Sequence, residues 1–236
     1  MPDTPTFGRY AEIPVEQMTA EQQAGYRFLV DGPRGRLPGP YRVWVHNPKL
    51  VHTVAPLGNH FTPGQSALSE REREITVLVI CSKWGSVYPT NAHERRGKEV
   101  GLPATVVDAI VAGRPAALTD EREGVVYDVA LALANGRLIP QDLYDRAVKT
   151  LGHDGVTDMI VLIGYYTCVS LTMNFYGAAL STWSSLCKKL GSRDMVSVLI
   201  GGALWWLFLG SARMLLIFRQ VYRGCQLTQR ACELLV

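Results

Sequence analysis

The run SEREREITVLVICSKWG, residues 69–85, constrains the fold of this chain more than any other stretch. Its apolar centre, ITVLVI, is compatible by itself with either a buried strand or a buried helix. Ser69, with Glu72 three residues later, forms the capping-box pattern that begins a helix, and acidic residues fill the first turn. We therefore predict a helix that ends at Gly85. Four residues of this helix would share one face: Ile75, Leu78, Val79 and Ser82.

Similar start and stop signals recur through residues 16–180 and predict an all-α fold. Asn47 followed by Pro48 begins one predicted helix, and Thr119 followed by acidic residues begins another. The run PRGRLPGPY, residues 33–41, has too many Gly and Pro residues for regular structure and is predicted to be a loop. No segment combines strand periodicity with hairpin turns. The predicted helices cover residues 15–32, 47–61, 69–85, 88–100, 102–113, 119–136, 139–152 and 153–178.

Composition shifts divide the chain into four regions. These are an extended proline-containing arm (1–15), a helical domain (16–180), a polar linker (181–194) and an apolar and basic extension (195–236). Residues 195–212 carry no charge, and eighteen such residues reach the lower end of what a bilayer requires. Residues 195–218 are therefore a candidate transmembrane helix. Basic residues on both sides leave its orientation open. The alternatives are a surface helix, a partner-binding helix and an erroneous translation of the gene's 3′ end.

The overall composition excludes several classes of protein. Hydrophobic residues make up 47% and charged residues 19%, which is typical of a globular protein. The net charge of +3 and the scattered arginines do not predict nucleic-acid binding. The five cysteines are odd in number and include no CxxC pair, so neither a metal site nor a disulfide framework is expected. The first residues show no secretory signal, so we expect a reducing, cytoplasmic location, with membrane association through the extension as a further option.

Glu74 and His93 are the best candidates for a catalytic pair. They lie nineteen residues apart in two consecutive predicted helices, and Gly85 allows a sharp reversal between these helices. A carboxylate beside an imidazole fixes its tautomer and suits it for acid–base catalysis. Near them, Tyr88 and Asn91 could add hydrogen-bond donors. Trp84 could add an apolar wall. On spacing alone, however, Glu74 could instead be a first-turn acid and His93 a solvated helix residue.

The segment LSEREREITVLVICSKWGSVYPTNAHERRGKEVGLP resembles the core motif of the carboxymuconolactone decarboxylase family, within the AhpD-like superfamily. Three further segments are similar to longer members of that family: IPVEQMTAEQQAGYRFLVDGPRG, GPYRVWVHNPKL and LIGYYTCVSLTMN. The resemblance covers residues 10–178, and the final 58 residues match nothing in it. It implies an AhpD-like all-α bundle whose subunits form homotrimers or homohexamers.

The resemblance implies one of two chemistries. The alkylhydroperoxidase branch uses a glutamate, a CxxC pair and a histidine; Glu74 and His93 match the first and last of these, but the cysteine positions are Ser86 and Pro89. Because peroxide reduction needs a thiolate, that branch is weakened, and Cys81 reads better as a small core residue. The lactone decarboxylase branch needs an acid and oxyanion stabilisation but no cofactor or metal.

On the decarboxylase interpretation, His93 donates the proton and Glu74 orients it. His46 and Arg73 are weaker candidates for binding an anionic small-molecule substrate. Tyr165 and Tyr166 read as core or oligomer contacts. Longer family members often have aromatic or acidic residues where this chain has Pro89, Thr90 and Asn91, so the substrate could differ from carboxymuconolactone. The competing hypotheses are a thiol-dependent peroxidase and a non-enzymatic oligomeric or membrane-associated binding protein.

Overall fold

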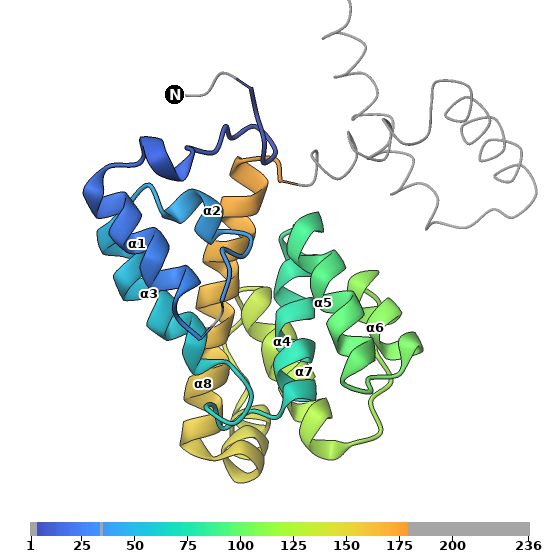
Figure 1. Cartoon of the computed structure of the whole chain (residues 1–236). Coiled ribbons are helices and arrows are strands. Elements are labelled where there is room, and N and C mark those ends of the chain that lie inside the picture. Colours follow the sequence, from blue (N-terminus) through green and yellow to red (C-terminus); the bar gives the residue numbers. More distant parts are fainter. Residues whose placement is uncertain (1–3, 34, 179–236) are drawn as a thin grey trace, which may run out of the picture. The chain divides into compact units, whose positions relative to one another are not determined.

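A computed structural model describes residues 4–33 and 35–178, and residues up to Gly177 form one compact unit. Within the described residues there are eight α-helices and one 3₁₀ turn, and the single β-type contact is an isolated bridge between Phe7 and Tyr10. The predicted all-α class is therefore confirmed (Figure 1). The predicted linker and the apolar extension lie entirely outside the described residues, as do the last two positions of the predicted domain, 179–180.

The helices follow the chain in a simple order. They are η1 (Val15–Gln17), α1 (Ala20–Val30), α2 (Tyr41–Trp44), α3 (Pro48–His60), α4 (Glu70–Lys83), α5 (Val87–Glu99), α6 (Ala104–Val111), α7 (Glu121–Ala134) and α8 (Gln141–Phe175). The predicted helix over 15–32 is in fact two elements, because a capping box between Thr19 and Gln22 starts α1 afresh. The short helix α2 was not predicted. It begins at Tyr41, the last residue of the run predicted to be a loop.

The capping predictions hold at two helices and fail at a third. Ser69 and Glu72 form the predicted capping box at the start of α4, and Asn47 caps α3 with Pro48 at its first position. The prediction that Thr119 caps α7 is wrong. Asp120 is the N-cap, and its side chain accepts the hydrogen bond from the Glu123 backbone N–H. A carboxylate serves this position well because it also favours the positive end of the helix dipole.

The two helices predicted over 139–152 and 153–178 form one long element, α8, with a break between them. Gly152 has φ 68° and ψ 172°, which is not helical and which side chains other than glycine rarely adopt. By length and composition α8 is the one described helix that could cross a membrane, a property shared with core helices of soluble proteins. The candidate transmembrane helix at 195–218 lies outside the described residues.

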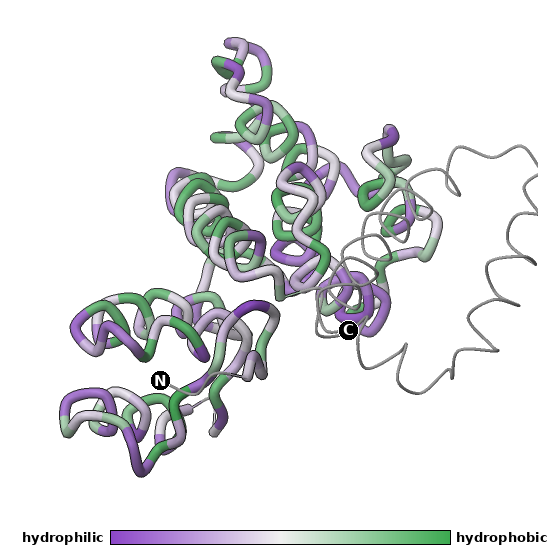
Figure 2. The backbone as a smooth tube through the Cα atoms, turned by 90° about the horizontal axis from the view of Figure 1, so that it is seen from above, coloured by the Kyte–Doolittle hydropathy of each residue, from purple (hydrophilic) through white to green (hydrophobic). Residues whose placement is uncertain are grey.

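The central helix is α4, which packs against α5, α6, α7 and α8. Every residue from Glu74 to Cys81 is buried, so burial in α4 extends beyond the face that Ile75, Leu78 and Val79 share. A helix that is apolar on most sides belongs in the middle of a bundle. Figure 1 shows α4 to α7 on one side of α8 and α1 to α3 on the other. Along the tube of Figure 2, hydrophobic and hydrophilic residues alternate in short runs, as expected for helices with one buried side.

The N-terminal arm folds back instead of running extended. The Phe7 side chain is 1% exposed, and the Arg9 backbone N–H donates to the Tyr176 carbonyl at 2.7 Å. Gly8 has a positive φ and lies so close to the backbone of residues 176 and 177 that a Cβ would overlap it. The arm therefore fastens the start of the unit to the end of α8.

Candidate functional site

Glu74 and His93 are in direct contact, as their spacing predicts. Glu74 lies in α4 and His93 in α5, and Gly85, with φ 58°, makes the turn between the helices. Nδ1 of His93 lies 2.6 Å from Oε2 of Glu74. The Glu74 side chain is 1% exposed and the His93 side chain 19% exposed. The carboxylate is thus inside the protein, while the imidazole remains accessible from one side.

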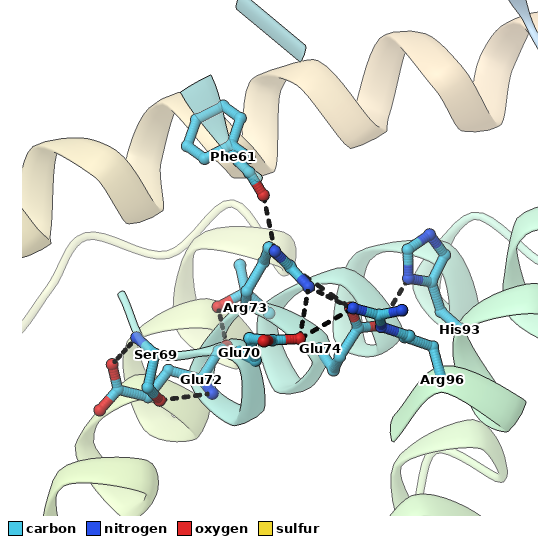
Figure 3. A network of polar contacts seen from close by, with 9 residues as sticks. Phe61, Ser69, Glu70, Glu72, Arg73, Glu74, His93 and Arg96 are labelled. Carbon is cyan, nitrogen blue, oxygen red and sulfur yellow. Dashed lines mark hydrogen bonds and ion pairs between the residues drawn. The ribbon is translucent and has the colours of Figure 1, made fainter. Parts of the chain in front are cut away.

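Arg73 holds the other carboxylate oxygen of Glu74. Its Nη2 donates to Glu74 Oε1 at 3.2 Å, and its Nη1 donates to the Phe61 carbonyl at 2.7 Å. A second acid, Glu70, lies 3.7 Å from Arg73 and accepts from Arg96 at 2.8 Å (Figure 3). The Arg73 side chain is only 11% exposed, and these contacts engage its guanidinium within the protein. Its direct role in binding substrate stays a prediction, whereas its role in fixing Glu74 follows from the geometry.

Tyr166, from α8, completes the surroundings of His93. Its ring meets the imidazole edge to face, with centroids 5.0 Å apart, and it also contacts Tyr165 at 5.3 Å. The Tyr165 hydroxyl lies 3.1 Å from that of Tyr41. Sequence reasoning assigned both α8 tyrosines to the core or to subunit contacts. The sequence signal that could have selected Tyr166 is its place in the similar segment LIGYYTCVSLTMN, but nothing in local spacing ties it to His93.

The three remaining candidates near His93 are placed less favourably. Trp84 is 43% exposed, and its carbonyl accepts from Asn174 at 2.8 Å. Tyr88 packs edge to face on Phe7, with ring centroids 5.5 Å apart. Asn91 is exposed, and it precedes His93 by two positions, which puts the two side chains on different sides of α5. Contact of these residues with a substrate stays a prediction.

His46 belongs to a separate cluster. Its Nε2 is hydrogen-bonded to the hydroxyl of Tyr10, whose ring also packs against Tyr176. Burial lowers the pKa of His46 and raises the pKa of Tyr10 to about 12. A neutral imidazole is a poor partner for an anion. Its proposed role in binding substrate is therefore not supported by its surroundings, and it stays untested.

Ser86 and Pro89, which occupy the positions of the two cysteines in the alkylhydroperoxidase pattern, are both buried in the packing of the helices. Ser86 is fully buried and its hydroxyl donates to the Ser170 carbonyl at 3.3 Å, while Pro89 is buried in the first turn of α5. Cys81 is also fully buried, and burial raises the pKa of its thiol to about 12. A thiol with that pKa stays protonated at neutral pH, so Cys81 is unsuited to attack a peroxide.

The arrangement around His93 suits proton transfer. A carboxylate that accepts from Nδ1 fixes the tautomer in which Nε2 receives or delivers the proton. It also stabilises the positive charge that the ring acquires on accepting one. Figure 3 shows the second ring nitrogen of His93 directed away from Glu74. No group of three or more His, Cys, Asp or Glu side chains suited to a metal ion occurs within the described part of the chain.

Comparison with known proteins places the fold. No protein-family model matches the sequence, and no curated protein matches it. A solved structure, described as an uncharacterized peroxidase-related protein from Silicibacter sp. TM1040, superposes with a TM-score of 0.60 at 17% sequence identity. The match covers 75% of this chain and 94% of the other. It confirms the all-α arrangement expected from the sequence at the level of fold, and it shows neither the AhpD-like superfamily nor the decarboxylase family.

Proposed function

We propose that this protein is a cofactor-independent acid–base enzyme that decarboxylates a small carboxylated lactone or a related product of aromatic degradation. The observation that carries the proposal is the 2.6 Å contact between a partly accessible His93 and a buried Glu74. The likeness of the sequence to carboxymuconolactone decarboxylases supplies the substrate class. The likeness in fold is compatible with it.

The proposed step moves one proton and one electron pair. The bond between the ring carbon and the carboxylate breaks, CO₂ leaves, and the electron pair passes into the conjugated lactone carbonyl as a dienolate. The imidazolium of His93 then protonates the ring carbon from Nε2, and solvent restores the proton. Glu74 remains ionised throughout and holds Nδ1. Tyr166 lies against the same imidazole and is the nearest aromatic wall for a planar substrate.

The test is CO₂ release from a panel of carboxylated lactones by wild type and by H93A and H93Q. We expect both variants to lose turnover while circular dichroism and assembly stay unchanged. His153, an exposed histidine of α8, provides the matched control, because H153Q removes an imidazole elsewhere and should keep full activity. Equal CO₂ release by wild type and H93Q contradicts the proposal.

A thiol-dependent peroxidase is the second candidate, and the description of the structural neighbour is the observation that favours it. Reduction of a peroxide by two thiols would yield an alcohol, water and a disulfide, and it needs a reactive thiolate. Of the cysteines in the described residues, Cys81 is buried and Cys168 is exposed. Peroxide consumption that stops on replacement of a cysteine, and survives H93Q, would favour this candidate over the first.

The remaining proposals concern assembly and location. Family resemblance supports a homotrimer or homohexamer, which light scattering of the purified protein would establish. The apolar run at 195–212 supports attachment to a membrane through residues 195–218 of an otherwise cytoplasmic protein. Fractionation of the full chain and of a form ending near residue 179 separates these cases, since an anchor would hold only the full chain in the membrane fraction.

A further inference from the structure

A cavity of about 470 Å³ lies at the ends of three helices, away from His93. Its walls come from the C-terminal parts of α4, α6 and α7 and from the residues that follow α6. Val79, Ile110, Tyr127, Leu131 and Ala134 supply its apolar lining. This volume is in the usual range for small-molecule sites, which combine an apolar lining with a few polar groups.

Two cations, Lys83 and Arg114, line this cavity, and no carboxylate does. Lys83 Nζ donates one hydrogen bond, to Asn135 Oδ1 at 2.6 Å, which leaves its other two hydrogens available. The Arg114 guanidinium has no hydrogen-bond or ion-pair partner among the described residues, and its five donors suit an oxyanion. The formal charge of the lining is therefore positive.

Ser82, in α4, lies beside these two cations. Its hydroxyl oxygen is shielded from solvent and makes no hydrogen bond, which is true of no other buried side-chain oxygen or nitrogen in the described residues. Ser82 also lines the cavity. Buried polar groups in native proteins are nearly always hydrogen-bonded. Because this oxygen has no surface accessible from the cavity, the two cations and the apolar lining carry the inference about what the cavity binds.

The three helix ends could instead favour a cation, because the last carbonyls of a helix carry partial negative charge. In each of them, backbone N–H groups of the following turn already satisfy carbonyls of the last turn. Ser86 N donates to Cys81, Arg114 N to Ala109 and Arg137 N to Ala132, at 2.9–3.0 Å. The full charges of Lys83 and Arg114 are therefore the stronger electrostatic feature of the cavity.

We propose that this cavity binds a small monocarboxylate with a compact apolar body. The carboxylate would lie between the Lys83 ammonium and the Arg114 guanidinium, and the apolar body would lie against Leu131 and its neighbours. Ser82 and Lys83 follow Glu74 by eight and nine residues on α4, so the cavity is separated from the candidate active site by roughly 13 Å along the helix. It is a second site and does not depend on the proposed decarboxylation.

Isothermal titration calorimetry on the full chain, with sodium hexanoate as probe, tests this proposal. We expect saturable binding of hexanoate that exceeds binding of acetate, 1-hexanol and hexylammonium, since each of these lacks one of the two required features. R114Q and K83Q should each weaken hexanoate binding about tenfold, the effect of losing one charge-assisted hydrogen bond. R95Q, which removes an exposed arginine of α5 whose side chain is 78% exposed, is the matched control and should bind as wild type does.

The proposal is overturned if hexanoate does not bind, if hexanol or hexylammonium binds equally well, or if the affinity for hexanoate is unchanged in both R114Q and K83Q. If hexanoate bound no more tightly than acetate, the apolar lining would contribute nothing to binding, and this result would also overturn the proposal. H93A separates the two sites. Hexanoate should bind H93A and wild type equally, and loss of binding in H93A would assign the carboxylate to the candidate active site instead.

Discussion

Oε2 of Glu74, whose side chain is only 1% exposed, lies 2.6 Å from Nδ1 of His93. The carboxylate therefore sets the tautomer of the imidazole from inside the protein and leaves Nε2 as the reactive atom. Because Arg73 donates a hydrogen bond to Oε1, both carboxylate oxygens of Glu74 are held in place.

We expect E74Q to lower kcat on the proposed substrate by about 100-fold, with little change in KM, because the neutral amide no longer stabilises the imidazolium. Steady-state kinetics with CO₂ detection would measure this effect. E99Q, on the exposed face of α5, is the control and should keep wild-type kcat. An E74Q enzyme with wild-type kcat would show that the contact is only structural.

The two described cysteines should differ sharply in reactivity. Burial raises the pKa of Cys81 to about 12, so at pH 8 it is protonated as well as inaccessible, whereas Cys168 is exposed. Brief treatment of native protein with iodoacetamide at pH 8 should modify Cys168 and leave Cys81 intact, as read by mass spectrometry of peptides. Denaturant should make both react. Modification of native Cys81 at the rate of Cys168 would contradict the buried position of α4.

Asp158 should contribute an acid-sensitive part of the stability. Burial disfavours its ionised form, but hydrogen bonds from His60, the Ala67 N–H and Ser66 outweigh this, and the pKa falls below its ordinary value of 3.8. A carboxylate with a lowered pKa in the folded state stabilises the protein above its unfolded pKa. This contribution is lost as pH falls through the lower folded pKa.

D158N should therefore be less stable than wild type at pH 6, and the difference should shrink as pH decreases below about 4. Urea unfolding at a series of pH values measures this change. D154N, at an exposed position of α8, is the control and should follow the wild-type curve. A difference that grows towards acid pH would have the wrong sign for this explanation.

Two glycines of α8 should respond oppositely to alanine. Gly152 has φ 68° and ψ 172°, so a side chain there is strained although nothing lies within 4 Å of the new Cβ. We expect G152A to cost about 1–3 kcal/mol of unfolding free energy. Gly164 is helical with open space around its Cβ, so G164A should stabilise by about 0.5–1 kcal/mol. Denaturant unfolding decides both, and a neutral G152A would mean that α8 runs straight through residue 152.

Much of the helical order could be predicted because its signals are local. The Ser69 capping box and the Asn47–Pro48 start each need only neighbouring residues, and both occur as expected. At α7 the choice between Thr119 and Asp120 depended on which side chain reaches the third backbone N–H, a question of geometry that residue type alone leaves open. Helix α2 is one turn long, too short for any periodicity to show.

The site was predictable only where its partners are close in sequence. Glu74 and His93 are connected by one sharp turn, so their meeting follows from an antiparallel helix pair. Tyr166 reaches His93 from α8, and the Phe61 carbonyl reaches Arg73 from the end of α3, and both contacts depend on how the helices pack. The same limit explains His46, whose partner Tyr10 lies in an arm that no periodic pattern describes.

The fastening of the arm to the end of α8 brings the two ends of the unit together. Arg9 and Tyr176 share a backbone hydrogen bond, so a short peptide could join the two ends and new termini could be opened elsewhere. The connection around Leu138, whose side chain is 95% exposed, offers such an opening. A circular permutant of this kind would carry the Glu74–His93 pair without residues 179–236, and would therefore allow the chemistry of the helical unit to be studied separately from the tail.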